Sequence, residues 1–225
     1  MNTLNLSAPL GALLVASATG GTPASLRQLY GLTPPQRLEA AHTALVLVDF
    51  QEEYFSGRLP LGDGPAAAAA AVRLVAWAHQ EGILVVHVQN VVSGPGSPLF
   101  ATGSPGTAII AALAPHPQDV LITKSMAGAF SRTDLDARLR ARGIDTLIVG
   151  GLMTHLAVTI TAADATVLGY HTIVASDATA TRALPEPAGM VVPAATVQRA
   201  ALAALADRVA DVLGNDELLR LPVEP

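Results

Sequence analysis

Five short runs of apolar residues recur along the chain, each flanked by polar or glycine-rich segments. Within a run, valine, leucine and isoleucine occupy successive positions rather than alternate ones. This pattern indicates a strand that is covered on both faces, because an exposed face would carry polar side chains. We therefore predict buried strands at residues 44–48, 83–88, 119–123, 146–149 and 171–175.

Segments with helical periodicity lie between these runs. The first is rich in alanine, places larger apolar side chains at helical spacing, and stops at Gly82. The predicted helices cover residues 66–80, 107–113, 133–142, 194–213 and the segment from the Gly150-Gly151 pair to Leu168. Strands that alternate with helices predict an α/β fold, here a three-layer, Rossmann-like α/β/α arrangement around a mainly parallel sheet.

The chain divides into a tail and one domain. We predict that residues 1–38 form an N-terminal tail or docking segment and that residues 39–225 form the domain. The tail lacks the positively charged start of a signal peptide, so we expect a cytoplasmic protein. Residues 91–105 hold many glycine, proline and serine residues, which is typical of a lid or binding loop.

Composition narrows the range of partners. The chain has 225 residues, is 51% apolar and carries a net charge of -5 without a basic stripe. A nucleic acid or a membrane is therefore not an expected partner, whereas a small-molecule substrate or another copy of the chain is. Cysteine is absent and the six histidines are scattered, so the sequence predicts neither disulfides nor a metal site.

Charged residues follow two of the predicted strands at the point where each ends. Asp49 follows residues 44–48, and Lys124, the only lysine of the chain, follows residues 119–123. Ligands bind at the carboxyl ends of parallel strands, so these two side chains are candidates for chemistry. The alternative is a purely structural ion pair that caps the sheet.

A third strand end leads into glycines and a helix start. The Gly150-Gly151 pair permits positive φ angles, and Thr154 is the predicted N-cap of the helix that follows. The first turn of that helix would offer unpaired N–H groups to an anion or an oxyanion. At residue 157, where a nucleophile would be expected, the chain has alanine.

These segments resemble the isochorismatase-like cysteine hydrolases. The resemblance extends from about residue 44 to 213 and has four motifs in the same order as the family. The motifs are Asp49-Phe50-Gln51, residues 124–130, residues 151–158, and Asp164-Ala165 with Gly169-Tyr170. It implies hydrolysis of amides or related carbon–nitrogen bonds, no cofactor, and a homo-oligomer such as a dimer or tetramer.

The resemblance also implies roles for individual residues. Asp49 corresponds to the general base, Lys124 to the residue that steadies it, and Ala157 to the cysteine nucleophile of an Asp-Lys-Cys triad. Backbone N–H groups of Met153 and Ala157 correspond to the oxyanion hole, with a cis peptide expected before Met153. The predicted substrate-binding residues are Gln51, Tyr54, Asn90, Phe130, Thr154 and His155.

Ala157 leaves several interpretations open, because a methyl group cannot attack a carbonyl. The sequence is an inactivated Cys→Ala variant, or it has lost the nucleophile naturally and uses Asp49 as a general acid on a vinyl ether, as some isochorismatases do. The second route needs a protonated Asp49, which Lys124 opposes, so we favour the amidase ancestry. A non-catalytic ligand-binding homologue is the remaining alternative.

Overall fold

The computed structural model describes residues 22–94, 96–187 and 189–225. Within these residues six strands form one sheet in the order β4-β3-β2-β5-β6-β9, and every neighbouring pair is parallel. The strands are β2 Thr43–Val48, β3 Leu84–Asn90, β4 Val120–Lys124, β5 Thr146–Leu152, β6 His171–Ala180 and β9 Asp211–Leu213. The predicted α/β fold is confirmed.

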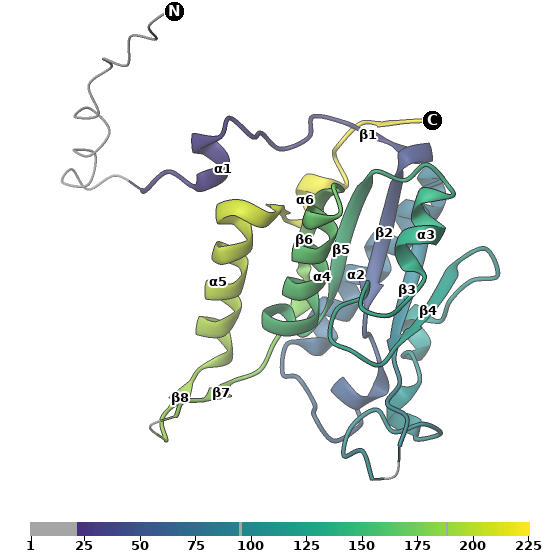
Figure 1. Ribbon diagram of the computed structural model, residues 1–225, viewed down its shortest axis with the longest axis vertical. Coiled ribbons are helices and arrows are strands. Elements are labelled where there is room, and N and C mark those ends of the chain that lie inside the picture. The colour runs from purple at the N-terminus through teal and green to yellow at the C-terminus, as the bar shows by residue number, and fades with distance from the viewer. Residues whose placement is uncertain (1–21, 95, 188) are drawn as a thin grey trace, which may run out of the picture.

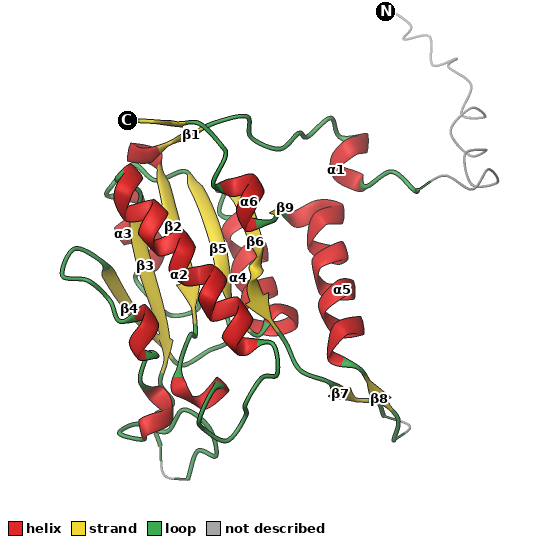
Figure 2. Ribbon diagram, turned by 180° about the vertical axis from the view of Figure 1, so that it is seen from behind, coloured by secondary structure: helices red, strands yellow, loops and turns green. Residues whose placement is uncertain are grey.

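Helices cover both faces of the sheet, so its central strands are buried on two sides (Figures 1 and 2). The prediction that residues 119–123 are covered on both faces is wrong, because β4 lies at the edge of the sheet and alternates buried and exposed residues, with Leu121 47% exposed. The main helices are α2 Gly64–Glu81, the short α3 Leu135–Arg140, α4 Thr159–Val167 and α5 Ala194–Ala204. On one face Leu47 packs in the same core as Leu74 of α2, and on the other Val46 packs in the same core as Leu139 of α3. Each such burial contributes about 2 kcal/mol, which explains why the strands are apolar throughout.

The end of the predicted helix 194–213 is wrong. The helix α5 stops at Ala204, a π turn η6 follows at Leu205–Val209, and Asp211–Leu213 is the edge strand β9. Pairing with β9 satisfies backbone groups of β6 that would otherwise lie unpaired at the edge of the sheet. That long-range gain outweighs the local helical preference of the segment.

The predicted helix 107–113 is also wrong. Two short 3-10 turns, η3 Pro105–Thr107 and η4 Ala111–Leu113, flank an extended Ile109. Ile109 forms an isolated β-bridge with Gln51, which keeps this residue out of a helix. The remaining short elements are η1 Ala40–His42, η2 Glu52–Tyr54, α6 Asn215–Leu218 and the antiparallel pair β7 Leu184–Pro185 and β8 Val191–Val192.

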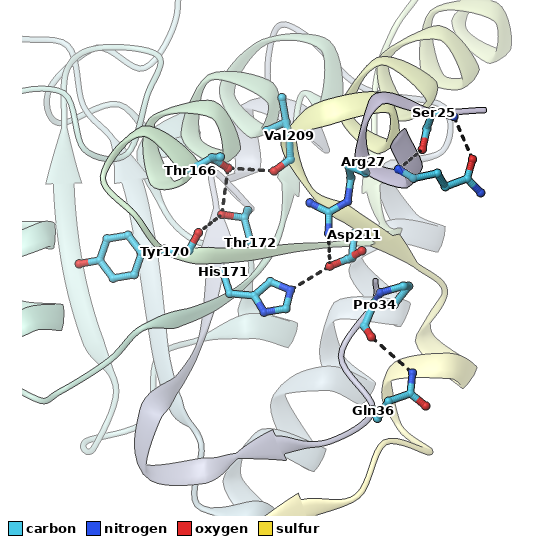
Figure 3. A network of polar contacts seen from close by, with 11 residues as sticks. Ser25, Arg27, Pro34, Gln36, Thr166, Tyr170, His171, Thr172, Val209 and Asp211 are labelled. Atoms are coloured by element: carbon cyan, nitrogen blue, oxygen red, sulfur yellow. Dashed lines mark hydrogen bonds and ion pairs between the residues drawn. The ribbon is translucent and has the colours of Figure 1, made fainter. Parts of the chain in front are cut away.

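The described part of the predicted tail is bound to the domain at both ends. The short helix α1 Leu26–Leu29 brings Arg27 within 2.6 Å of Asp211, whose other close partner is His171 at 2.8 Å (Figure 3). Further along, β1 Leu38–Glu39 pairs with β10 Val223–Glu224. The rest of the tail prediction, residues 1–21, lies outside the described residues.

No helix in the described part of the chain is both long enough and apolar enough to cross a bilayer. The loops that follow β2, β3, β4, β5 and β6 all leave the sheet at its carboxyl edge because these strands are parallel. This edge therefore carries Asp49, Lys124 and the turn that begins after Leu152.

Candidate active site

The site is built around a buried ion pair. Asp49 follows β2 and Lys124 is the last residue of β4, with β3 between the two strands. The Lys124 ammonium donates a hydrogen bond of 2.7 Å to Oδ2 of Asp49 and one of 3.1 Å to the Met126 carbonyl. The two side chains are 2% (Asp49) and 0% (Lys124) exposed. The sequence-predicted pair is thus brought together across three strands.

The backbone and the carboxylate of Asp49 are both unusual. Its φ is +58°, in the left-handed region that few residues other than glycine adopt. Its Oδ1 is buried and has no hydrogen-bond partner among the described residues. A strained backbone and an unsatisfied buried oxygen each cost free energy, and such costs concentrate at functional sites.

Burial changes the acidity of Asp49. Removal from water raises the pKa of the carboxyl from its ordinary value of 3.8 to about 6, and the charge of Lys124 offsets only part of that rise. The sequence predicts that Lys124 keeps Asp49 ionised, but burial raises the pKa of Asp49 by more than Lys124 lowers it. A carboxyl with this pKa can accept a proton above pH 6 and donate one below it.

The turn after β5 lies beside Asp49, because Gly151 pairs with Val48 on the neighbouring strand. Gly151 has φ +152°, and a Cβ on it would lie 2.4 Å from the Val48 carbonyl oxygen. Only glycine fits such a close approach of two backbones. The peptide bond between Leu152 and Met153 is cis.

A π turn, η5 Thr154–Val158, opens the helix that continues as α4. The Val158 N–H donates to the Met153 carbonyl at 3.3 Å, the spacing of a π turn, and π turns often occur at functional sites. The predicted N-cap role of Thr154 is wrong: Met153 takes that position, and Oγ1 of Thr154 has no hydrogen-bond partner in the described part of the chain. The wider turn starts one residue earlier than a capped α-helix would.

Ala157 lies inside this turn and is 3% exposed. Its methyl group belongs to the same apolar cluster as Val48 and Ala129. Because β5 is the neighbour of β2, the position of the family nucleophile and Asp49 share one edge of the sheet. A side chain that could attack a carbonyl is absent from this position.

Gln51 and Asn90 are linked to one another. The Gln51 side-chain amide donates to the carbonyls of Asn90 and Thr107, at 2.8 and 2.7 Å, and its oxygen accepts from the Asn90 N–H. Gln51 thereby holds the end of β3 against η3. In contrast, Oδ1 of Asn90 is buried and has no partner among the described residues.

Aromatic residues from two loops form one wall near the site. The Tyr54 ring meets the Phe100 ring edge-on at a centroid distance of 5.2 Å. Burial raises the pKa of the Tyr54 hydroxyl, so this group stays protonated. The backbone of Phe100 has φ +52°, and its N–H lies 3.4 Å from a Glu53 carboxylate oxygen. Phe100 places the predicted binding loop 91–105 beside Tyr54.

Two other predicted substrate-binding residues, His155 and Phe130, contact different parts of the protein. The His155 imidazole contacts the Thr181 hydroxyl at 2.5 Å, which ties the π turn to the end of β6. Burial lowers the pKa of His155, and the charge of Arg182 lowers it further. The Phe130 ring stacks on Tyr170 at 5.9 Å, so at least one of its faces is used for packing.

Sequence reasoning missed Arg182. It follows β6, which continues to Ala180 rather than ending near residue 175, and its Nε is buried without a partner. The signal was weak, because Ser176 and Asp177 interrupt the apolar run and look like a strand end. Arg182 is the one arginine at this edge with an unsatisfied buried nitrogen among the described residues.

A second histidine–aspartate cluster lies at the opposite edge of the sheet. Asp119 binds His79 at 2.7 Å and His87 at 3.2 Å, at the amino end of β4. His87 is buried within β3. In the described part of the chain, no three histidine, aspartate or glutamate side chains are arranged to hold a metal ion.

Comparison with known proteins gives consistent matches. A family model described as the isochorismatase domain matches residues 43–217. An uncharacterized isochorismatase family protein of Bacillus subtilis, YddQ, is 32% identical and matches over 79% of this chain and 99% of its own length. The ureidoacrylate amidohydrolase RutB of Methylobacterium radiotolerans is 35% identical over 64% of this chain and 69% of its own length.

A solved structure shares the whole architecture. The crystal structure of an isochorismatase from Pseudomonas putida KT2440 superposes with a TM-score of 0.80 and 33% sequence identity. The match covers 87% of this chain and 99% of the other. The region matched by the family model, residues 43–217, contains all six strands of the sheet as well as Asp49 and Lys124.

Proposed function

This chain belongs to the isochorismatase family of hydrolases, and we propose that its site is built to hydrolyse an amide-type carbon–nitrogen bond of a small molecule through an Asp-Lys-Cys framework. The buried pair of Asp49 and Lys124 beside the π turn carries this proposal. An amidohydrolase among the relatives, RutB, supports the reaction class.

Each residue has a defined role in the proposed reaction. With cysteine at position 157, the Asp49 carboxylate takes the thiol proton and the thiolate attacks the carbonyl carbon. N–H groups at Met153 and residue 157 stabilise the tetrahedral oxyanion. The proton held by Asp49 passes to the departing nitrogen, which leaves as ammonia or an amine. Water then attacks the thioester, releases the acid and restores the thiol, with Lys124 opposing excess negative charge throughout.

Alanine at position 157 stops this sequence before its first bond forms. The framework around Ala157 is otherwise complete, which supports a state in which substrate binds and is not turned over. Both an introduced Cys→Ala change and a natural loss lead to this state. We therefore propose that the chain with Ala157 retains ligand binding and lacks hydrolysis of amides.

Restoring the nucleophile tests the proposal. Ala157→Cys is incubated with a panel of small amides and ureides, and released ammonia is measured against the unchanged chain. We expect ammonia only from Ala157→Cys, and a loss of about 100-fold or more when Asp49→Asn is added, because the thiol then lacks its base. Correctly folded Ala157→Cys that releases ammonia from no member of the panel contradicts the proposal.

Asp49 also favours a second candidate function, general-acid cleavage of a vinyl ether without a nucleophile. Its Oδ1 has no hydrogen-bond partner among residues 22–94, 96–187 and 189–225, and its pKa is raised to about 6, so the protonated form is accessible. In this reaction Asp49 protonates the vinyl carbon, water adds to the resulting oxocarbenium ion, and Asp49 takes back one proton from that water. The hemiketal then collapses to a carbonyl compound as its hydroxyl proton is transferred to the departing alcohol oxygen. Cleavage of a vinyl ether by the unchanged chain, and its loss in Asp49→Asn, would favour this function over the first.

We further propose that the chain assembles as a homo-oligomer, a dimer or a tetramer. The helix α5 supports this because it is rich in alanine and Val197 is its buried residue, which leaves an apolar face uncovered. Light scattering after size-exclusion chromatography tests the assembly. A monomer mass at micromolar concentration contradicts it.

A further inference from the structure

The two edge strands of the sheet begin in the same way. β4 lies at one edge and β9 at the other. Asp119 directly precedes β4, and Asp211 is the first residue of β9. Each carboxylate contacts a histidine of the neighbouring strand: Asp119 contacts His87 of β3 at 3.2 Å, and Asp211 contacts His171 of β6 at 2.8 Å. The amino end of each edge strand is thus tied to the sheet through side chains.

Asp119 also binds a helix and closes its own turn. Its Oδ1 lies 2.7 Å from Nε2 of His79 in α2, and its Oδ2 accepts the His116 N–H at 2.8 Å. The Asp119 N–H donates to the His116 carbonyl at 3.0 Å. The side chains of Asp119 and His87 are 1% and 3% exposed. One buried carboxylate therefore joins α2, β3 and the turn before β4.

The groups around Asp119 keep its carboxylate ionised. Burial raises the pKa of Asp119, but hydrogen bonds from His116 and His79 lower it by more, so the net pKa lies below its ordinary value. Burial lowers the pKa of His87, which is therefore an uncharged donor at neutral pH. The rings of His79 and His116 lie 4.6 Å apart, and Arg142 lines the same cavity as Asp119 and His79.

β4 has few other contacts that hold it in register. It is five residues long, Val120–Lys124, and within the described residues β3 is its one neighbour in the sheet. Val120 and Ile122 are buried, whereas Leu121 is 47% exposed. A short edge strand with one buried face opens more easily than a central strand. The side-chain contacts at its two ends therefore contribute much of what holds it in place.

The carboxyl end of β4 is the end that reaches the site. Lys124, its last residue, donates to Oδ2 of Asp49 at 2.7 Å. A slip of β4 by one residue along β3 would move Lys124 by about 3 Å and turn its side chain to the other face of the sheet. Either change would separate the ammonium from Asp49. The Asp119 contacts oppose such a slip from the amino end of the same strand.

Asp211 provides a contrast at the other edge. Its side chain is 3% exposed and contacts Arg27 at 2.6 Å in addition to His171 (Figure 3). β9 is separated from β2 by β6 and β5. Loss of the Asp211 contacts should therefore loosen β9 and α1 without moving Lys124.

We propose that Asp119 is a positioning residue of the site: through β4 it holds the Lys124 ammonium against Asp49. This inference rests on the proposed function, since it gives Asp119 a part in setting the acidity of the base of that reaction. Asp119 lies at the amino edge of the sheet and acts on the carboxyl edge through the register of one strand.

The acidity of Asp49 reports on the position of Lys124 without turnover. Burial raises the pKa of Asp49 to about 6, and Lys124 keeps it from rising further. Carbon-13 NMR of the Asp49 carboxyl carbon follows this titration in the chain with Ala157. We expect a midpoint of about 6 in the unchanged chain and of about 7 or higher in Asp119→Ala. Amide hydrogen exchange in residues 120–124 should be at least about tenfold faster in the variant.

Two controls separate positioning from a general loss of stability. Asp211→Ala removes the corresponding buried carboxylate of the other edge strand. It should lower the free energy of unfolding and leave the Asp49 midpoint within about 0.3 pH units. His87→Met removes one donor to Asp119 and should raise the Asp49 midpoint, whereas His87→Gln, which keeps an N–H donor, should raise it less.

Several results would overturn the inference. One is an Asp49 midpoint that is the same in Asp119→Ala and in the unchanged chain, and another is an equal shift in Asp211→Ala. If Asp119→Ala fails to fold, the two substitutions of His87 decide, and equal midpoints for both contradict the positioning role. Exchange in residues 120–124 of the unchanged chain at the rate of an unstructured peptide also contradicts it.

The outcomes separate this inference from the proposed function. If Ala157→Cys releases ammonia and Asp119→Ala leaves the Asp49 titration unchanged, the hydrolase stands and the positioning role falls. If the Asp49 midpoint rises as expected and Ala157→Cys releases no ammonia, the positioning role of Asp119 stands and the hydrolase falls.

Discussion

The Lys124 ammonium lies 2.7 Å from Oδ2 of Asp49, and this contact joins the ends of β4 and β2 across the end of β3. Only one carboxylate oxygen takes part in this contact, and Oδ1 has no hydrogen-bond partner within the residues that the structure describes, so it can take a proton or a ligand. The pair therefore does more than close the sheet. It presents a carboxyl with a pKa of about 6 beside the turn that carries residue 157.

The pH dependence of the restored enzyme should report on Asp49. A base must be ionised, and burial raises the pKa of Asp49 from 3.8 to about 6. We expect kcat/KM of Ala157→Cys to fall tenfold per pH unit as the pH drops below about 6, and to be flat just above it. A rate that instead rises below pH 6 would show that Asp49 acts as an acid.

Removing the ammonium should affect both stability and acidity. Lys124→Met leaves the buried carboxylate without its partner, which costs about 3 to 5 kcal/mol unless Asp49 takes a proton. The pKa of Asp49 should rise above about 6, since a cause that lowers it is lost. Urea denaturation at pH 5 and pH 8 measures the free energy of unfolding. Lys124→Met should lower it more at pH 8 than at pH 5, because Asp49 is then either a buried unpaired carboxylate or must bind a proton at a pH above its pKa.

An exposed pair provides the control for Lys124→Met. Arg138 and Asp134 lie 2.8 Å apart, with side chains 48% and 58% exposed. Arg138→Met should therefore cost less than about 1 kcal/mol and show no difference between the two pH values. Similar losses for both variants would contradict a special role for the buried pair.

Gly151 should tolerate no side chain. In Gly151→Ala the added Cβ meets the Val48 carbonyl oxygen, and φ +152° is unfavourable for alanine. We expect a loss of about 3 kcal/mol or more in urea denaturation, together with loss of ligand binding. Gly62→Ala is the control, because nothing lies within 4 Å of its Cβ position, and it should change stability by less than about 0.5 kcal/mol.

The attachment of residues 26–32 to the rest of the protein should depend on Arg27. Its contact with Asp211 is largely buried, at 12% and 3% exposure, whereas the Arg37–Glu224 contact is exposed at 62% and 52%. Arg27→Met should cost about 3 kcal/mol and speed amide hydrogen exchange in residues 26–32. Arg37→Met should cost less than about 1 kcal/mol. Equal exchange in both variants would show that Arg27 does not anchor the segment.

Local patterns in the sequence predict most elements of this fold. The apolar run 44–48 becomes β2 because every residue in it is buried on one face or the other. Gly82 ends α2 with φ +76°, as expected for a glycine after a helix. Asp49 and Lys124 can also be identified from the sequence, because each charge lies at the end of an apolar strand. Burying a charge there costs free energy unless the charge has a partner, so such a position indicates an ion pair or a functional site.

The tertiary structure decided what depends on contacts between distant residues. The pairing of β9 with β6 turned the end of a predicted helix into a strand, and the extension of β6 brought Arg182 to the site. The left-handed backbone of Asp49 and the π turn before α4 have no local signature, because packing against neighbouring strands imposes them. The sequence by itself determined the position of most strands and helices and showed that Asp49 and Lys124 lie at strand ends. Strand order and register, which are sums of long-range contacts, decided which of those charges meet.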